Sequence, residues 1–335
     1  MRLFLASYLS GKHQADINDD LADNFQCNDA RLARIYAKKD PYSFTELDAA
    51  RSRIGIQRLF ARNQEKAFIK THAAVAEFRG YPSFDVASTY ASILILRNPL
   101  AVLPSFARHM SISINEAVVS MASSNTILGK TEDGTVPTLT SSWSKFTRSW
   151  IAARQQMNAV FVKYEDMKDD AYRAFSEVLA HIRIPVDEAR VKKAIGATDF
   201  EQMKAQDLAA GFKERTRADK GAVFFRSGKT EGWRDELSEE QVVATIRNHW
   251  DVMEQLDYIP ADLQTEFEQI KFDALEAMVA KGVDIGIYTE ELNALRAKRG
   301  IRSKLQARSN KSQIKDKKKS SKAQRSRPAL RKTFG

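Results

Sequence analysis

The sequence lacks several features that define common classes of protein. Cys27 is the only cysteine among 335 residues, so disulfides within the chain and metal sites built from several thiolates are excluded. This single cysteine favours a reducing cytoplasm as the compartment. The apolar runs are far too short to cross a bilayer. Glycine-rich loops of the kind that cradle phosphates are also missing from the sequence.

Positive charge is concentrated at the C-terminal end of the chain. The whole sequence carries a net charge of +10, but residues 298–335 hold 15 Lys and Arg against one Asp. That segment therefore carries +14 and the remaining 297 residues carry −4. A segment so rich in charge and so poor in apolar groups predicts a disordered tail. Nucleic acid or an anionic membrane surface suits such a tail, although Phe334 is its only aromatic residue, which argues against base stacking.

Helical and strand patterns alternate along the first 260 residues. Short apolar runs rich in Ile, Val, Leu and Phe predict strands at 67–71, 92–96 and 159–163. The alternation predicts an α/β domain over residues 1–260, with a mainly parallel sheet flanked by helices on both faces. A helical extension is expected over 261–297, broken near Gly282 and Gly286, followed by the basic tail at 298–335.

Capping residues and apolar spacing predict where the helices lie. Asn98 followed by Pro99 is a favourable helix start, because Asn can accept free amide hydrogens and Pro fits the first helical position. Pro104 inside that helix predicts a kink. Polar, glycine-containing segments predict loops at 123–141 and 211–235. The helices are expected at 2–9, 45–64, 99–109, 113–122, 142–158, 169–182, 187–196 and 238–256.

Each predicted strand leads into a residue suited to acid–base or anion chemistry. His72, Arg97 and Tyr164 follow the three strands, and ligands in an open α/β sheet bind beyond the carboxyl ends of its strands. Lys70 and His72 are two residues apart, so they lie on the same side of an extended chain. His72 is a candidate to accept a proton, and Lys70 to stabilise negative charge. A histidine that serves only the structure is the alternative.

Two further groups of residues suit a phosphate. Ser105 lies about two helical turns beyond Arg97, so a hydroxyl and a guanidinium can bind one phosphate; an arginine paired with a carboxylate is the alternative. Residues 224–229, FFRSGK, combine cations, a hydroxyl and a glycine in a loop that can wrap a phosphate, a solvated basic loop being the alternative. Structural roles are expected for the histidines on predicted helices, His109, His181 and His249.

The order and spacing of these blocks resemble the sulfotransferases that use 3′-phosphoadenosine 5′-phosphosulfate (PAPS), over residues 1 to about 258. Five blocks carry the resemblance: residues 68–72, 96–99 with Ser105, 162–167, 198–200 with Met203, and 226–233. Residues 68–72 resemble the strand with the catalytic histidine, and residues 96–99 with Ser105 resemble the 3′-phosphate site. Residues 162–167 resemble the strand whose tyrosine lies near the adenine. Residues 198–200 with Met203 resemble the segment packed on the adenine, and residues 226–233 resemble the closing loop that also holds the 3′-phosphate.

The resemblance implies a three-layer α/β/α fold of the P-loop nucleotide-kinase type. It also implies transfer of a sulfuryl group from PAPS to a hydroxyl or amine of a small-molecule or glycan acceptor, with no metal. His72 is then the general base, and Lys70 supports the reacting centre. The residues that the resemblance assigns to the nucleotide are Arg97, Ser105, Tyr164, Thr198, Phe200, Arg226, Ser227 and Gly228.

The start of the chain departs from the family pattern. The family opens with a strand and a Lys-Ser-Gly loop that cradles the 5′-phosphosulfate, whereas residues 1–5 resemble the helix directly after that loop. Residues 10–12 echo the loop, but residues 16–18 follow at the distance that the family shows beyond its first helix, so Lys12 is rejected as the loop lysine. The first strand and the phosphosulfate loop are therefore expected to be absent, and a longer native protein is expected.

Two functions remain open on the sequence alone. The first is a cytosolic-type sulfotransferase, weakened by the loss of an anion cradle at a helix N-terminus. The second is a non-catalytic nucleotide-binding remnant whose basic tail binds nucleic acid or an anionic surface. PAPS-dependent labelling of an acceptor favours the first. Salt-sensitive nucleic-acid binding that disappears when residues 298–335 are deleted favours the second.

Overall fold

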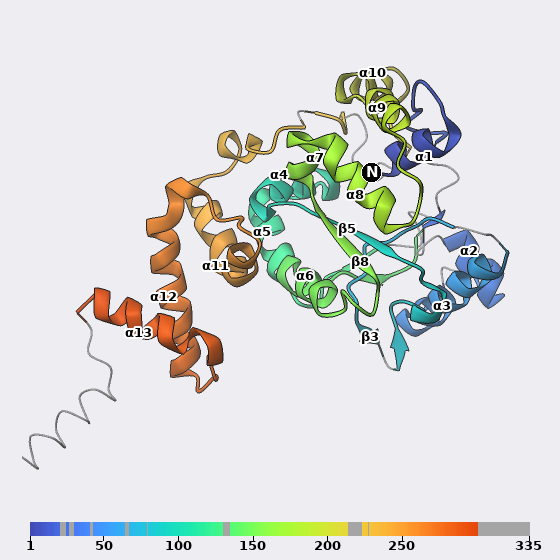
Figure 1. Ribbon diagram of the computed structural model, residues 1–335. Helices are drawn as coiled ribbons and strands as arrows, with labels where there is room; N and C mark the ends of the chain where they lie inside the picture. Colours follow the sequence, from blue (N-terminus) through green and yellow to red (C-terminus); the bar gives the residue numbers. More distant parts are fainter. Residues whose placement is uncertain are drawn as a thin grey trace, which may run out of the picture. The chain divides into compact units, whose positions relative to one another are not determined.

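The computed structural model describes residues 1–20, 25–26, 30–40, 43–63, 67–78, 80–129, 135–213, 223–226 and 228–300. It divides into two compact units, Met1–Pro260 and the segment from Ala261 onward. All strands found among the described residues belong to the first unit (Figure 1). The basic tail from residue 301 on lies outside the described residues.

Helices are the predominant regular structure in the described part of the first unit. They are α1 (Arg2–Ser10), α2 (Ala30–Ala37), α3 (Glu46–Asn63), α4 (Pro99–Met110), α5 (Ile114–Ala122), α6 (Trp143–Ala152), α7 (Tyr164–Asp169), α8 (Ala171–His181), α9 (Glu188–Ala197), α10 (Phe200–Ala210) and α11 (Glu239–Gln255), with 3-10 turns η2 (Val86–Ser88) and η5 (Gly232–Asp235). The strands are β1 (Phe25–Gln26), β2 (Ile69–Lys70), β3 (Glu77–Phe78), β4 (Tyr81–Pro82), β5 (Ser92–Leu96), β6 (Ile127–Leu128), β7 (Thr138–Leu139) and β8 (Ala159–Lys163). Over the described part of the chain, no helix combines the length and apolarity needed to span a membrane.

The strands among the described residues form four two-stranded sheets. β5 and β8 pair in parallel, from Ser92 opposite Ala159 to Leu96 opposite Lys163. β1 and β2 also pair in parallel, whereas β3–β4 and β6–β7 are antiparallel. Helices separate the partners of each parallel pair along the chain, which is the connection that parallel strands require. The predicted α/β class is confirmed.

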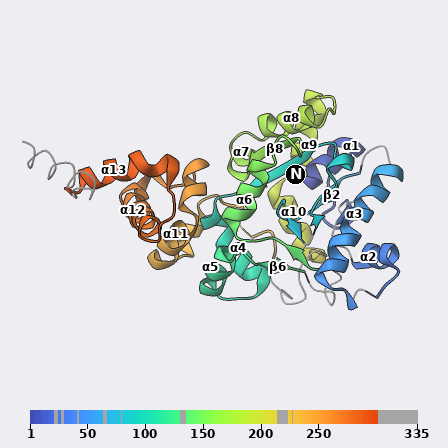
Figure 2. The same cartoon turned by 90° about the horizontal axis from the view of Figure 1, so that it is seen from below.

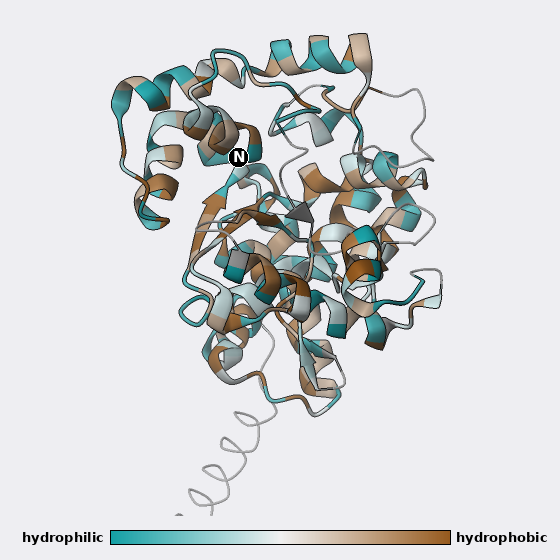
Figure 3. Cartoon of the chain, turned by 90° about the vertical axis from the view of Figure 1, so that its right-hand side faces the viewer, coloured by the Kyte–Doolittle hydropathy of each residue, from teal (hydrophilic) through white to brown (hydrophobic). Residues whose placement is uncertain are grey.

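Side chains alternate between the two faces of the β5–β8 pair along each strand. Apolar residues therefore lie on both faces, and helices cover both of them. Ile93, Val160 and Val162 face one side, where α1, α8 and α9 pack. Leu94 and Leu96 face the other side, which α6 covers. Figure 1 shows α8 and α6 on opposite sides of the two strands, and Figure 2 shows α1, α8 and α9 gathered beside β8. In Figure 3 the strands inside the first unit are largely brown, the colour of hydrophobic residues, whereas teal, the colour of hydrophilic residues, is frequent on the helices around them.

The first helix is anchored in this core by two aromatic residues. Phe4 is fully buried and stacks on Phe175 of α8, with 4.0 Å between the ring centroids. The hydroxyl of Tyr8 donates a hydrogen bond to the backbone oxygen of Pro185 at 2.5 Å. Gly11 ends α1 with φ 71°, a left-handed conformation in which glycine is favoured. The helix predicted at 2–9 is confirmed.

The described part of the second unit, up to residue 300, contains two helices. α12 (Gln264–Ala280) and α13 (Thr289–Lys298) are accompanied by 3-10 turns η6 (Ala261–Leu263) and η7 (Gly286–Tyr288). The buried ammonium of Lys271 on α12 pairs with Glu291 of α13, and Arg296 pairs with Glu276 at 2.6 Å. Two helices with a break near Gly282 and Gly286 are therefore confirmed.

Several local predictions are wrong. The segment 123–141 is more than a loop, because β6 and β7 pair there and Arg53 donates a hydrogen bond to the backbone oxygen of Pro137 at 3.0 Å. The helix predicted at 142–158 ends at Ala152, because the chain then turns into β8 through Asn158, whose φ is 42°. The sequence does not predict helices α2 and α10, although Asp199 caps α10 by accepting hydrogen bonds from the backbone amides of Glu201 and Gln202.

Candidate active site

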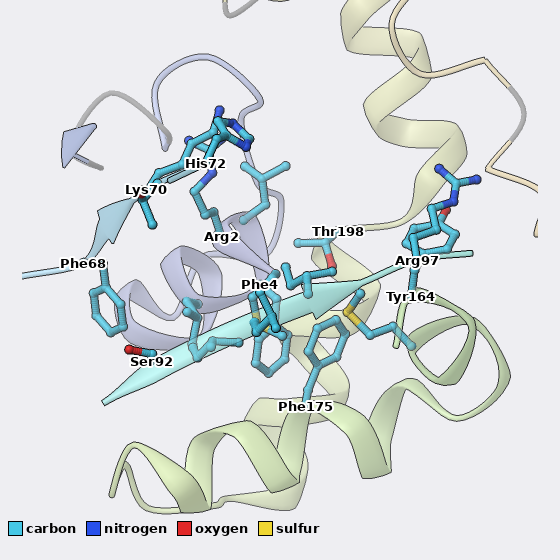
Figure 4. Close-up of a pocket in the computed structure, with 18 of the residues that line it drawn as sticks. Arg2, Phe4, Phe68, Lys70, His72, Ser92, Arg97, Tyr164, Phe175 and Thr198 are labelled. Carbon is cyan, nitrogen blue, oxygen red and sulfur yellow. The ribbon is translucent and has the colours of Figure 1, made fainter. Parts of the chain in front are cut away.

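Every predicted site residue that the structure describes lines one cleft of about 1470 Å³. These residues are Lys70, His72, Arg97, Ser105, Tyr164, Thr198, Phe200, Arg226 and Gly228. Ser227 lies outside the described residues. Figure 4 shows Lys70 and His72 at one end of the view and Arg97 with Tyr164 at the other, with β5 running between them. We call these two regions the acid–base end and the phosphate end.

The acid–base end follows the short strand β2. Lys70 is the last residue of β2, and His72 is exposed two residues later. The backbone beyond His72 is buried and fixed, because the indole nitrogen of Trp150 donates a hydrogen bond to the backbone oxygen of Ala73 at 3.2 Å. Arg2 on α1 extends toward the same end in Figure 4, a cation that the sequence did not single out.

The register of β5 and β8 explains why Arg97 and Tyr164 meet. Leu96 pairs with Lys163, so the next residue of each strand emerges at the same level. The Arg97 guanidinium lies over the Tyr164 ring, 4.3 Å from its centroid. Its Nη2 donates a hydrogen bond to the backbone oxygen of Lys229 at 3.0 Å. Its buried Nε has no hydrogen-bond partner among the residues described.

A hydrogen-bonded turn fixes the backbone that follows Arg97. The Asn98 side chain accepts a hydrogen bond from Leu100 N at 3.0 Å and donates one to the backbone oxygen of Tyr258 at 3.1 Å. Glu165 accepts hydrogen bonds from Asn98 N at 3.2 Å and from the Tyr258 hydroxyl at 3.3 Å. Burial raises the pKa of Tyr258 far above its ordinary value, so this phenol stays protonated as a donor. The predicted helix start at Asn98 is confirmed.

Ser105 lies on α4 and is exposed to the cleft. The helix continues through Pro104, and the kink predicted there stays a prediction. Arg108, one turn after Ser105, pairs with Glu236, which also lies 3.9 Å from Arg226. Sequence reasoning missed Arg108 and Glu236. The spacing of three residues between Ser105 and Arg108 was the only signal for the arginine, and no local pattern pointed to Glu236.

Tyr164 and Phe200 hold the loop that contains Gly228. The Tyr164 hydroxyl donates a hydrogen bond to the backbone oxygen of Gly228 at 3.1 Å. Burial raises the pKa of Tyr164, which keeps this donor protonated. Gly228 has φ 59°, and a Cβ there would lie 2.9 Å from the Phe200 ring. Glycine is therefore required at this position for both its backbone conformation and its close contact.

Thr198 and Phe200 form the wall between α9 and α10. The Thr198 hydroxyl hydrogen-bonds the backbone oxygens of Ala194 at 3.0 Å and Ile195 at 3.1 Å, so its oxygen remains available only as an acceptor. The Phe200 ring meets the edge of Phe225 at 6.2 Å between centroids. The two side chains offer an apolar face and one acceptor, which suits a flat base with an amino group.

Two histidines outside this cleft have structural partners. His249 on α11 is buried, and its Nδ1 lies 2.9 Å from the hydroxyl of Ser144 on α6. Burial lowers the pKa of His249 to about 4, so it is neutral at physiological pH. His181 contacts the backbone oxygen of Asn158 through Nε2 at 2.8 Å. These contacts agree with the structural roles expected for both residues.

The comparisons with known proteins identify the family. The model of the sulfotransferase domain family matches residues 14–257, which is more than half of the chain. The chain belongs to the sulfotransferase domain family. This family membership confirms the resemblance to PAPS-dependent sulfotransferases that the sequence blocks carried.

Individual relatives are distant. The chain is 28% identical to an amine sulfotransferase of Oryctolagus cuniculus over 156 residues, 44% of this chain and 50% of that protein. It is 29% identical to cytosolic sulfotransferase 12 of Arabidopsis thaliana over 115 residues, 31% of this chain and 33% of that protein. The matches thus span half or less of these relatives. Retinol dehydratase, solved with androsterone and the inactive cofactor PAP, shares the fold with a TM-score of 0.51 at 16% identity, over 75% of this chain and 76% of that one.

Proposed function

We propose that this protein is a sulfotransferase that moves a sulfuryl group from PAPS to a hydroxyl or amine acceptor. One observation carries the proposal: a cleft in a sulfotransferase-family domain is lined at one end by Lys70 and His72 and at the other by Arg97, Ser105 and Arg226. A proton acceptor and an anion site in one cavity are what transfer from a phosphorylated donor needs.

The phosphate end fits a dianionic group. Arg97 presents a buried Nε that has no hydrogen-bond partner in the described part of the chain, and a buried guanidinium donor is costly to leave unbonded. Ser105 adds a hydroxyl, and Arg226 adds a half-exposed guanidinium. Guanidinium groups bind phosphate oxygens in a planar, two-pronged geometry. These three residues would hold the 3′-phosphate of the donor.

The chain's own residues supply the proton chemistry and the orientation. His72 accepts the proton of the acceptor group as this group attacks, and Lys70 stabilises the negative charge that develops at the reacting centre. Tyr164, Thr198 and Phe200 orient the adenine. The donor PAPS supplies the activated sulfuryl group and leaves as adenosine 3′,5′-bisphosphate (PAP). The chemistry requires no metal in this proposal.

The lining beside His72 favours a small apolar acceptor. Phe84, Phe146 and Trp150 line the cleft and belong to the same apolar cluster as Ala73, the neighbour of His72. The Phe84 and Trp150 rings lie 5.2 Å apart between centroids. Androsterone and retinol are bound by retinol dehydratase, which shares the fold. A glycan, with its polar surface, fits this lining less well than a phenol, an alcohol or an amine on an apolar skeleton.

The proposed organisation places the reaction in residues 1–260, with 261–297 as a helical extension and 298–335 as a basic tail. The single Cys27 supports a cytoplasmic protein. The tail is the part that would bind nucleic acid or an anionic surface if the protein had that role.

The test is transfer of radiolabelled sulfate from PAPS by the purified full chain to a panel of phenols, alcohols, amines and glycans. Labelling of one acceptor class together with stoichiometric release of PAP is expected. PAP binding without labelling of any acceptor would contradict the proposal and favour the nucleotide-binding remnant. In that case, deletion of residues 298–335 should abolish salt-sensitive RNA binding.

A further inference from the structure

A buried carboxylate outside the predicted nucleotide-binding set contacts the loop that carries Arg226. Asp207 lies on α10 and is only 2% exposed. Its Oδ2 accepts hydrogen bonds from the backbone N of Phe224 at 2.6 Å and of Phe225 at 3.1 Å. The next residue along the chain is Arg226. The backbone immediately before this arginine is therefore tied to α10.

The same helix also contacts the far side of the loop. The Phe200 ring, in the first turn of α10, lies against Gly228 so closely that no Cβ fits between them. Phe200 and Asp207 are seven residues apart, which places them on one face of the helix, about 10 Å apart along its axis. One face of α10 thus supports the loop both before and after Arg226.

Among the described residues, other contacts reach the loop on both sides of Arg226 and at Arg226 itself, whose guanidinium lies 3.9 Å from Glu236. Beyond Arg226, the Tyr164 hydroxyl donates to Gly228 O and the Arg97 guanidinium donates to Lys229 O. Before Arg226, Phe212 packs on Phe224 at 4.8 Å between ring centroids. A ring–ring contact leaves rotation about the backbone free, whereas two amide hydrogen bonds to one carboxylate oxygen define its direction. Asp207 is thus the directional contact on this side.

We propose that Asp207 is a positioning residue for the 3′-phosphate site, which holds the start of the loop so that the Arg226 guanidinium faces the phosphate. The proposal rests on the proposed function, because it assumes that this loop binds the 3′-phosphate. Asp207 does not line the cleft. It acts through the backbone of the two phenylalanines and selects PAP over nucleotides that lack the 3′-phosphate.

The sign of the effect separates positioning from simple charge. A carboxylate near an anion site repels the anion, so removal of its charge alone should strengthen PAP binding. Loss of the two hydrogen bonds frees the loop and should weaken PAP binding instead, because Arg226 then has to be ordered when the ligand binds. A decrease in affinity after removal of a negative charge therefore points to position.

The experiment compares PAP with adenosine 5′-monophosphate by calorimetry on the full chain. We expect Asp207→Ala to lower PAP affinity about tenfold and the affinity for adenosine 5′-monophosphate less than twofold. Asp207→Asn keeps an oxygen acceptor and should restore most of the PAP affinity. Glu201→Ala removes an exposed carboxylate from the same helix and is the control for charge.

Each result decides between the two proposals. Equal losses for both nucleotides in Asp207→Ala, or no loss, would overturn the positioning role while the proposed function stands. Absence of PAP binding by the wild-type protein would instead overturn the proposed function. If Asp207→Ala does not fold, Asp207→Glu replaces it, because its longer side chain moves the two amides without removing the charge. A selective loss of PAP affinity in that variant supports the proposal, and an unchanged ratio of the two affinities refutes it.

Discussion

The two ends of the cleft differ in how firmly the structure holds their side chains. At the phosphate end, Arg97 directly follows a five-residue strand whose partner carries Tyr164, and backbone and ring contacts hold both side chains. At the acid–base end, Lys70 is the last residue of a two-residue strand, and His72, two residues later, is exposed. The proposed nucleotide site is therefore shaped before ligand binding, whereas the position of the proposed proton acceptor depends on the short segment that carries it.

This difference separates binding from chemistry. Changes at the phosphate end should alter affinity for the nucleotide, because a preformed site contributes equally before and during the reaction. Changes at the acid–base end should alter the rate alone, because the role proposed for His72 is exerted only when the acceptor proton moves. Three variants test this separation and a fourth tests stability, from the largest effect to the smallest.

Replacement of His72 should have the largest effect. We expect His72→Ala to reduce kcat by about 10²- to 10⁴-fold, the usual contribution of a general base, with PAP affinity unchanged. Steady-state kinetics and calorimetry on the same preparation measure both quantities. His181→Ala, which removes a histidine outside the cleft lining, should change neither. Loss of PAP binding together with activity in His72→Ala would show that His72 is a structural residue and would break the comparison.

The buried His249 should give the next largest effect, on stability. Its folded pKa of about 4 lies below the ordinary value near 6.5, so the unfolded chain binds more protons between these values. The free energy of unfolding should therefore rise by about 3 kcal/mol as pH increases from about 4 to 6.5. Urea denaturation across this range measures it.

A variant tests whether His249 causes this pH dependence of the free energy of unfolding. His249→Gln lacks the titrating group, so its stability should vary less over the same pH range. An identical slope in both proteins would assign the dependence to other groups. The measurement also gives the pH below which the protein unfolds. A loss of activity below that pH reflects unfolding and not a change at the acid–base end of the cleft.

Replacement of Arg97 should weaken nucleotide binding. Arg97→Lys keeps the charge but loses the planar fork and the stacking on Tyr164, so PAP affinity should fall about ten- to a hundredfold. At saturating PAPS, kcat should stay within about threefold of wild type. The matched control is Arg190→Lys, which removes a similar arginine from the face of Tyr8, 4.9 Å from its centroid and outside the cleft lining. A fall in kcat at unchanged affinity would contradict the division between the two ends.

Removal of the Ser105 hydroxyl should have the smallest effect. Ser105→Ala deletes one donor from a site that also contains two arginines, so PAP affinity should fall about three- to tenfold. Titration with PAP checks this value, and Ser120→Ala on α5, which is not part of the cleft lining, serves as the control. An unchanged affinity would show that the Ser105 hydroxyl does not contribute and that the guanidinium groups alone bind the phosphate.

The sequence predicted best the elements whose signals are local. Strand boundaries at 92–96 and 159–163 match β5 and β8 because both strands are continuous apolar runs. The helix start at Asn98 and the end of α1 at Gly11 follow from capping chemistry within a few residues. The candidate residues at the ends of these strands could be named for the same reason.

What the sequence could not reveal depends on contacts across long separations. Asp207 bonds amides 17 and 18 residues away, and Glu236 pairs with Arg108 across 128 residues. Such carboxylates look like any solvated acid on a helix or turn until the fold brings their partners near. The pairing of β6 with β7 was missed because two-residue strands leave no periodicity to detect.

Trp233 gives the protein an optical reporter. Its indole is 4% exposed, lines the cleft, and its ring nitrogen has no hydrogen-bond partner within the described residues. Emission from an indole depends on the polarity and charge around it, and the Arg234 guanidinium already lies 4.4 Å from this ring's centroid. Binding of a phosphorylated ligand should therefore change the fluorescence of the unlabelled protein. Trp233→Phe should remove part of this change, and that part comes from the wall of the cleft that contains Trp233.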